Sequence, residues 1–293
     1  MKLAAFPKCF MDQLVVDHTM SVFDWIAMAA ELPVDGLEMY SGFLENFDPA
    51  YLARVREAIE ARGLDMPMFC CSPDFTSPDE RDQRREIEIE KKMIGVTAAL
   101  GGRFCRVLSG QRRPEVSRAQ GVKWVSECLR ELVDFAADKN VVLALENHYK
   151  DNYWRHPEFA QKSDVFIEIL SAVPSPWLGA QFDPSNTILA GEDPIDLLQK
   201  IKGRVVTMHA SDRRLKPGHS IEELRLAEDS MGYAAILSHG VIGSGLNDFP
   251  KIFSILKSAG FDGWVSIEDG VNGLDEIRQS AEFLLPFIRG ARQ

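Results

Sequence analysis

Residues 141–148 read VVLALENH, five apolar residues followed by Glu146, Asn147 and His148. An uninterrupted apolar run of this length is typical of a β-strand buried on both faces, as in a parallel sheet covered by helices. The segment therefore predicts a central strand whose carboxyl end carries polar groups.

Seven further segments show the same short apolar pattern and alternate with stretches of helical periodicity. The expected strands span residues 3–6, 36–40, 66–71, 104–109, 141–146, 178–183, 205–210 and 264–268. The expected helices span residues 21–32, 48–62, 79–100, 116–139, 159–173, 194–201, 248–259 and 274–288. Such alternation predicts a parallel sheet, and eight units of this kind in 293 residues predict a single (β/α)8 TIM barrel of the α/β class.

A doubly wound open sheet is the alternative architecture with the same alternation. It usually carries a glycine-rich turn after its first strand, whereas residues 7–10 read PKCF. We therefore expect one domain over residues 1–293, with a long insertion at about 213–247 after the seventh strand. Loops of that length usually carry function or short helices of their own.

Charge and composition exclude several classes of partner. The chain has 33 Lys and Arg against 44 Asp and Glu, a formal net charge of −11, which repels phosphate backbones and anionic lipid. No apolar run approaches the ~20 residues of a membrane-spanning helix, and residues 1–7 do not read as a signal peptide. Five cysteines without a CxxC motif are typical of reduced thiols. We expect a cytoplasmic protein that binds neither nucleic acid nor membrane.

The fifth to eighth expected strands each end in a carboxylate or an imidazole. These residues are Glu146, Asp183, His209 and Glu268. The carboxyl ends of barrel strands meet at one face, where barrels of this kind hold their functional groups. Three carboxylates and one imidazole suit a divalent cation such as Mn²⁺, Mg²⁺, Co²⁺ or Zn²⁺. A set of salt-bridged residues at the barrel mouth is the alternative. Within the fourth strand, Arg106 is a cation that needs an inner carboxylate as its partner.

Five motifs resemble one known superfamily. They read LALENH (143–148), FDPSN (182–186), MHASD (208–212), GSGLNDF (243–249) and VSIE (265–268). Over nearly the whole chain they resemble the sugar phosphate isomerase/epimerase superfamily of xylose-isomerase-like barrels. The resemblance implies one divalent ion, Mn²⁺ in the first place, held by the four strand-end residues. It also implies that Glu146 and Glu268 remove and return a proton beside a substrate carbonyl, and that the chain forms a homodimer or homotetramer.

The residues around these motifs set further expectations. His148 follows Glu146 by two residues, so both side chains project to one face of an extended strand, where the imidazole is an acid or base, or only a hydrogen-bonding group. Substrate contacts are expected from Glu38, Asn186, Arg213, His219 and Trp154. Epimerases of free ketoses in the superfamily often have His at the position of Asn186 and Arg at that of Leu215. The sequence therefore departs from standard ketose recognition.

Two enzymatic interpretations remain open. The first is an isomerase or epimerase of a sugar, ketose or inosose that works through an enediolate, which a divalent ion stabilises. The second is a metal-dependent lyase or dehydratase of a 3-oxo-sugar, an inosose or a dehydroshikimate-like compound, with His148 as the additional acid or base. Endonuclease IV shares the fold but needs three metal ions and a basic groove, which a net charge of −11 does not favour. A sugar-binding barrel without catalysis is opposed by the intact set of candidate ligands.

Overall fold

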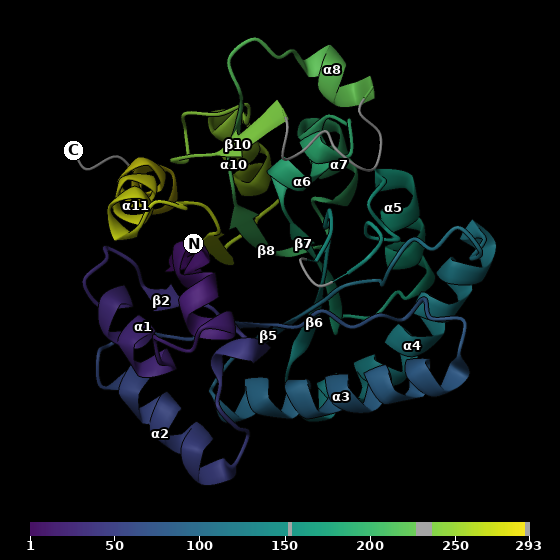
Figure 1. The fold of residues 1–293 in the computed structure, drawn as a ribbon, viewed down its shortest axis with the longest axis horizontal. Coiled ribbons are helices and arrows are strands. Elements are labelled where there is room, and N and C mark those ends of the chain that lie inside the picture. The colour runs from purple at the N-terminus through teal and green to yellow at the C-terminus, as the bar shows by residue number, and fades with distance from the viewer. Residues whose placement is uncertain (152–153, 227–235, 291–293) are drawn as a thin grey trace.

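A parallel β-barrel surrounded by helices forms the body of the protein in the computed structural model, which describes residues 1–151, 154–226 and 236–290 (Figure 1). The barrel sheet runs in the order β2-β1-β11-β8-β7-β6-β5-β4-β3. Its strands are β1 (Lys2–Ala5), β2 (Gly36–Leu37), β3 (Met39–Tyr40), β4 (Met68–Cys70), β5 (Phe104–Val107), β6 (Val142–Glu146), β7 (Leu178–Phe182), β8 (Val205–Ala210) and β11 (Trp264–Ile267). All pairings within this sheet are parallel. The predicted (β/α)8 barrel is confirmed.

The ring closes through the second expected strand, which is interrupted at Glu38. Its first half, β2, pairs with β1, and its second half, β3, pairs with β4. The backbone N–H of Glu38 still donates to the carbonyl of Ala5, with 2.9 Å between N and O. The two halves together correspond to the single strand that the sequence predicts at residues 36–40, so all eight expected strands are present.

Helices follow the strands and cover the outside of the barrel. They are α1 (Val22–Ala29), α2 (Pro49–Glu60), α3 (Glu80–Ala99), α4 (Arg118–Asp138), α5 (Ser163–Ala172), α6 (Pro184–Leu189), α7 (Pro194–Ile201), α10 (Phe249–Ser258) and α11 (Leu274–Arg289). Side-chain caps fix several of their starts. Ser21 and Asp24 form a reciprocal capping box at α1, and Asp79 caps α3. Apolar residues such as Trp25 of α1, Phe166 of α5 and Phe253 of α10 are almost fully buried against the sheet.

Two helices differ from the sequence-based expectation. Helix α5 begins at Ser163 and not at residue 159, because Lys162 has an extended backbone (φ −81°, ψ 137°) and is the N-cap. The backbone N–H groups of Phe159 and Ala160 donate to the carbonyl of Gly110 and to Oγ of Ser109. Helix α6 is not expected from the sequence, since six residues are too few to show periodicity. Its N-cap is Asp183, one of the predicted metal ligands.

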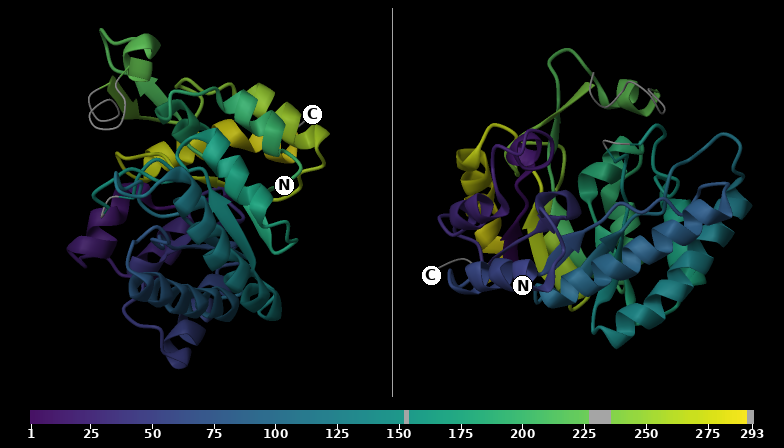
Figure 2. Two further views of the ribbon diagram at one scale, coloured as in Figure 1. Left: turned by 90° about the vertical axis from the view of Figure 1, so that its right-hand side faces the viewer. Right: turned by 60° about the horizontal axis from the view of Figure 1, so that its bottom comes forward.

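The insertion after β8 carries secondary structure of its own. Strands β9 (Arg213–Leu215) and β10 (Leu237–His239) pair antiparallel, and α8 (Ile221–Leu226) lies between them in sequence. Leu224 of α8 and Leu237 of β10 pack with Ile188 of α6 in a small apolar cluster apart from the main core. In both views of Figure 2 this segment projects from one end of the barrel. Residues 227–235 of the predicted insertion lie outside the described residues.

Within the described part of the chain, no helix combines the length and the apolarity needed to cross a bilayer.

Candidate metal centre and active-site pocket

The four predicted metal ligands converge at the carboxyl end of the barrel. They are Glu146 at the end of β6, Asp183 just after β7, His209 in β8 and Glu268 just after β11. These strands are consecutive neighbours in the sheet, so their ends lie side by side. Each residue offers one ligand atom, and the four atoms lie within 4.8 Å of one another. All four side chains are buried, with Glu268 the most exposed at 7 %.

The three carboxylates share this buried position at an electrostatic cost. Burial, together with the negative charges of Glu268 and Glu146, raises the pKa of Asp183 to about 7. Burial also opposes ionisation of Glu146, but His209, His148 and Arg106 outweigh it and lower the pKa of Glu146 to about 2. One member of the set is therefore hard to ionise while another is ionised throughout the neutral range. A cation between them would relieve this conflict.

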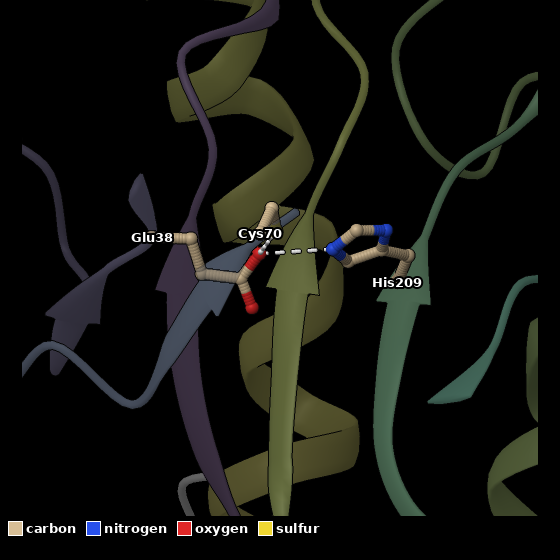
Figure 3. Close-up of side chains that lie close together, drawn as sticks. All are labelled: Glu38, Cys70 and His209. Carbon is tan, nitrogen blue, oxygen red and sulfur yellow. Dashed lines mark hydrogen bonds and ion pairs between the residues drawn. The ribbon is translucent and has the colours of Figure 1, made fainter. Parts of the chain in front are cut away.

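Glu38 lies behind His209 and fixes the direction of its ring (Figure 3). Nε2 of His209 is 2.9 Å from Oε2 of Glu38, and Nδ1 is 3.2 Å from Oε1 of Glu146. With the proton on Nε2, the lone pair of Nδ1 faces the carboxylates. This is the arrangement in which an outer carboxylate orients a metal-binding histidine. The thiol of Cys70 lies beside the same Glu38 oxygen, at 3.9 Å.

Two cations contact Glu146 and Glu268, each at the carboxylate oxygen that does not face His209. Nη1 of Arg106 lies 3.0 Å from Oε2 of Glu146, and Nζ of Lys8 lies 3.4 Å from Oε1 of Glu268. The sequence-based expectation that Arg106 pairs with an inner carboxylate is confirmed. Lys8 was not predicted. Its sequence signal is its place three residues after the end of β1, at the same end of the barrel as the four ligands.

A pocket of about 400 Å³ opens above this cluster. Its wall includes Glu268, His148 and two of the residues predicted to contact substrate, Asn186 and Arg213. Nδ2 of Asn186 is 3.5 Å from Oε1 of Glu146. The guanidinium of Arg213 donates to Nε2 of His239, with 2.7 Å between the nitrogens.

The other three predicted substrate contacts lie elsewhere in the structure, which does not place them on the pocket wall. Glu38 is fully buried, and its Oε2 is 2.9 Å from Nε2 of His209. His219 lies near α8, where its Nδ1 is 2.9 Å from Oε2 of Glu223. Trp154 is half-buried, and its backbone N–H donates to the carbonyl of Asp151. Hydrogen bonds within the barrel and the insertion therefore hold Glu38 and His219 away from the pocket.

His148 lines the pocket and faces a buried carboxylate that the sequence analysis missed. Its Nδ1 lies 3.8 Å from Oε2 of Glu158, and Glu158 is 0 % exposed. Burial lowers the pKa of His148, but Glu146 and Glu158 outweigh it, and the net shift is upward from 6.5. Glu158 follows no strand and belongs to no motif, so only the three-dimensional contact identifies it.

Comparison with known proteins assigns the chain to a family. Residues 26–287 match the family model for the xylose isomerase-like TIM barrel. The chain belongs to the xylose isomerase-like TIM barrel family. This confirms the superfamily that the five motifs resemble.

Relatives within and around the xylose isomerase-like family carry out more than one reaction. An inosose dehydratase of Geobacillus thermodenitrificans is 23 % identical over 143 residues, which cover 48 % of this chain and 44 % of that protein. The chain thus matches less than half the length of this curated relative. Among solved structures, L-ribulose 3-epimerase superposes with a TM-score of 0.77 at 15 % identity, covering 99 % of this chain and 95 % of the other. The zinc-bound IOLI protein superposes with a TM-score of 0.75 at 17 % identity, covering 100 % of both chains. At these identities the two structures demonstrate a shared fold.

Proposed function

We propose that the protein is a divalent-metal-dependent isomerase or epimerase of a sugar, ketose or inosose, which moves a proton on the carbon beside a carbonyl. The observation that carries this proposal is the convergence of Glu146, Asp183, His209 and Glu268 within 4.8 Å at the mouth of the barrel. The chemistry of the donors fits a divalent ion, because they comprise three carboxylates and one imidazole whose Nδ1 faces them. Mn²⁺ is the first choice, with Mg²⁺, Co²⁺ and Zn²⁺ as alternatives. The zinc in the IOLI structure supports this class of ion.

A bound divalent ion would polarise the substrate carbonyl and stabilise the negative charge of the enediolate. The proton transfers belong to the protein. Glu146 and Glu268 come from β6 and β11, which are separated by two strands in the sheet. Each has one oxygen directed to Nδ1 of His209, at 3.2 and 3.5 Å. The two carboxylates therefore enter the cluster from two strands that are not neighbours in the sheet.

Two cations next to Glu146 and Glu268 control the protonation of these carboxylates. Arg106 holds Glu146, and Lys8 holds Glu268. Both cations favour the ionised carboxylate, which is the form that accepts a proton from carbon. In the proposed reaction one carboxylate takes the proton from the carbon beside the carbonyl. The carboxylic acid formed in this step returns the proton to the neighbouring carbon in an isomerisation. In an epimerisation, the second carboxylate first takes up a proton from water and then delivers it to the same carbon from the other side. Asn186 and Arg213 line the pocket, and we propose that they bind substrate hydroxyls.

A dehydratase or lyase is the second candidate. It would act on an inosose, a 3-oxo-sugar or a dehydroshikimate-like compound. Similarity to inosose dehydratases over half of the chain supports it. His148 supports it as well, because elimination needs a further acid to protonate the leaving oxygen, and this imidazole lines the pocket beside Glu146.

Proton NMR in D2O tests the proposal and separates the two reactions. Mn²⁺-loaded enzyme would be incubated with ketoses, inososes and 3-oxo-glycosides, and the products read after removal of the metal. Deuterium beside the carbonyl with every hydroxyl retained indicates an isomerase or epimerase. Loss of water with new vinylic signals indicates a dehydratase. Glu146→Gln should abolish both changes while circular dichroism stays the same. Absence of exchange and of elimination with every substrate, in protein that contains metal, would overturn the proposal.

Further proposals concern the protein in the cell. We propose a small-molecule substrate, and no nucleic-acid or membrane partner, for a chain whose net charge is −11. The free state of all five cysteines supports a cytoplasmic location. We also propose that residues 1–293 form one domain with the insertion at about 213–247. A homodimer or homotetramer is proposed, and light scattering of the purified protein would measure it.

A further inference from the structure

Two buried polar atoms face each other beside the pocket without forming a hydrogen bond. They are Nδ1 of His148 and Oε2 of Glu158, at 3.8 Å. Neither atom has a hydrogen-bond partner in the described part of the chain. A buried polar group without a partner costs free energy, so two such atoms aimed at each other are each other's natural partners. A movement of about 1 Å would bring them to hydrogen-bonding distance, and catalytic contacts often tighten in this way when substrate binds.

The rest of the Glu158 carboxylate is fixed in place. Oε1 accepts hydrogen bonds from the backbone N–H and from Oγ of Ser109, at 2.6 and 2.5 Å. The backbone N–H of Glu158 donates to the carbonyl of Tyr149 at 2.8 Å. Ser109 lies just beyond the end of β5, on the barrel itself. These contacts position Glu158 from two sides and leave Oε2 as the oxygen directed at His148.

The position of the His148 ring follows from this contact. Nδ1 is turned inward to Glu158, while the ring lines the pocket. The other ring nitrogen is therefore the one available to a molecule in the pocket.

We propose that Glu158 is a positioning residue, which hydrogen-bonds Nδ1 of His148 and directs the other ring nitrogen at the leaving oxygen of a β-hydroxy carbonyl substrate. The inference rests on the second candidate of the proposed function, elimination, and deepens it, because it names the group that directs the acid. One carboxylate of the Glu146 and Glu268 pair removes the proton from the carbon beside the carbonyl. The electron pair of that C–H bond first shifts toward the carbonyl oxygen to give an enolate, which can take a proton back. It then forms the C=C bond as the C–O bond at the next carbon breaks. The leaving oxygen takes a proton from His148 and departs as water, so no oxidant or reductant is needed.

Glu158→Gln tests this inference in the full-length, Mn²⁺-loaded protein. Gln keeps the oxygen that Ser109 binds and removes the charge that faces His148. Two rates are measured on one inosose sample in D2O: the rate of deuterium exchange beside the carbonyl and the rate of water loss. The readout is the ratio of these two rates. We expect water loss to fall by about 100-fold, the usual contribution of a positioned general acid, while exchange continues. Adding the change to His148→Gln should slow water loss no further, because Glu158 acts through His148.

Glu90→Gln is the matched control. Glu90 of α3 is as buried as Glu158, at 1 % exposed, but it contacts the thiol of Cys105, outside the pocket. This variant should leave both rates unchanged. If Glu158→Gln fails to fold, Ser109→Ala loosens the same carboxylate and should lower water loss selectively.

The outcomes separate this inference from the proposed function. A Glu158→Gln enzyme in which both rates fall equally, or neither falls, would overturn the inference. Exchange without any loss of water in the unchanged enzyme would also overturn it, while leaving an isomerase or epimerase in place. If the unchanged enzyme shows neither deuterium exchange nor loss of water, the proposed function and the inference are both refuted.

Discussion

Replacement of Asp183 by Asn should stabilise the metal-free protein while removing its response to metal. Oδ1 of Asp183 accepts hydrogen bonds from the backbone of Asn186 at 2.9 Å and from Oγ of Ser211 at 2.7 Å. The amide oxygen of Asn can accept both. The substitution therefore removes the negative charge and leaves the local hydrogen bonds in place.

The size of the effect follows from the pKa of Asp183. Burial and two neighbouring carboxylates raise it from 3.8 to about 7 in the folded, metal-free protein. The folded state thus binds a proton more tightly than the unfolded state. The free energy of unfolding accordingly falls as pH rises from about 4 to about 7, by about 1.4 kcal/mol per unit and on the order of 4 kcal/mol in all. The side-chain amide of the Asp183→Asn variant does not titrate, so the variant escapes this loss.

Urea denaturation followed by circular dichroism would measure the difference. In EDTA at pH 8 we expect the free energy of unfolding of Asp183→Asn to exceed that of the unchanged protein by up to about 4 kcal/mol. This difference in stability should become smaller as the pH is lowered toward 4. Mn²⁺ at 1,000 times Kd should add about 4 kcal/mol to the unchanged protein and little to the variant. A variant that is less stable in EDTA at pH 8, or a gap that widens toward acid, would refute this reasoning.

Three further substitutions address the groups around the site. Glu38→Leu removes the acceptor that orients His209 and should weaken Mn²⁺ binding by about 10- to 100-fold in isothermal titration; an unchanged affinity would show that Glu38 has no such role. Arg106→Met leaves Glu146 buried without its cation and should cost about 3–5 kcal/mol in urea denaturation with EDTA, and less with Mn²⁺; equal losses in both conditions would contradict the pairing. Ser21→Ala removes the cap of α1 and should cost about 1 kcal/mol, whereas an unchanged urea midpoint would argue against the cap.

Much of the fold is predictable because buried parallel strands are short continuous apolar runs. All eight expected strands are present. The strand at residues 36–40 is interrupted at Glu38, and the strands expected at 66–71 and 104–109 are shorter, at Met68–Cys70 and Phe104–Val107. Helix boundaries are less predictable where backbone groups find partners outside the helix. Residues 159–162 continue the helical pattern in sequence, but contacts with Gly110 and Ser109 hold two of them outside α5.

The candidate ligands could be found in the sequence because each ends a strand, and strand ends meet at one face of a barrel. Of the groups that hold them, Arg106 was predicted to pair with an inner carboxylate, but the contacts of Lys8 and Glu38 were not predicted. Glu38 and His209 are 171 positions apart, and Glu158 is 49 positions from the serine that fixes it. No local pattern encodes such distances. His219 was expected at the pocket because it lies in a long insertion near the site, but the insertion turns it toward Glu223.

The order of strands around the barrel divides the site between the two halves of the chain. Every candidate metal donor comes from the arc β6-β7-β8-β11, residues 142–268. Three of the groups that orient or neutralise these donors, Lys8, Glu38 and Arg106, come from the first 106 residues. Evolution could therefore retune metal preference and proton affinity through substitutions in the N-terminal half alone, with all four donors retained. Relatives with the same ligand set and different reactions are the expected product of such a division.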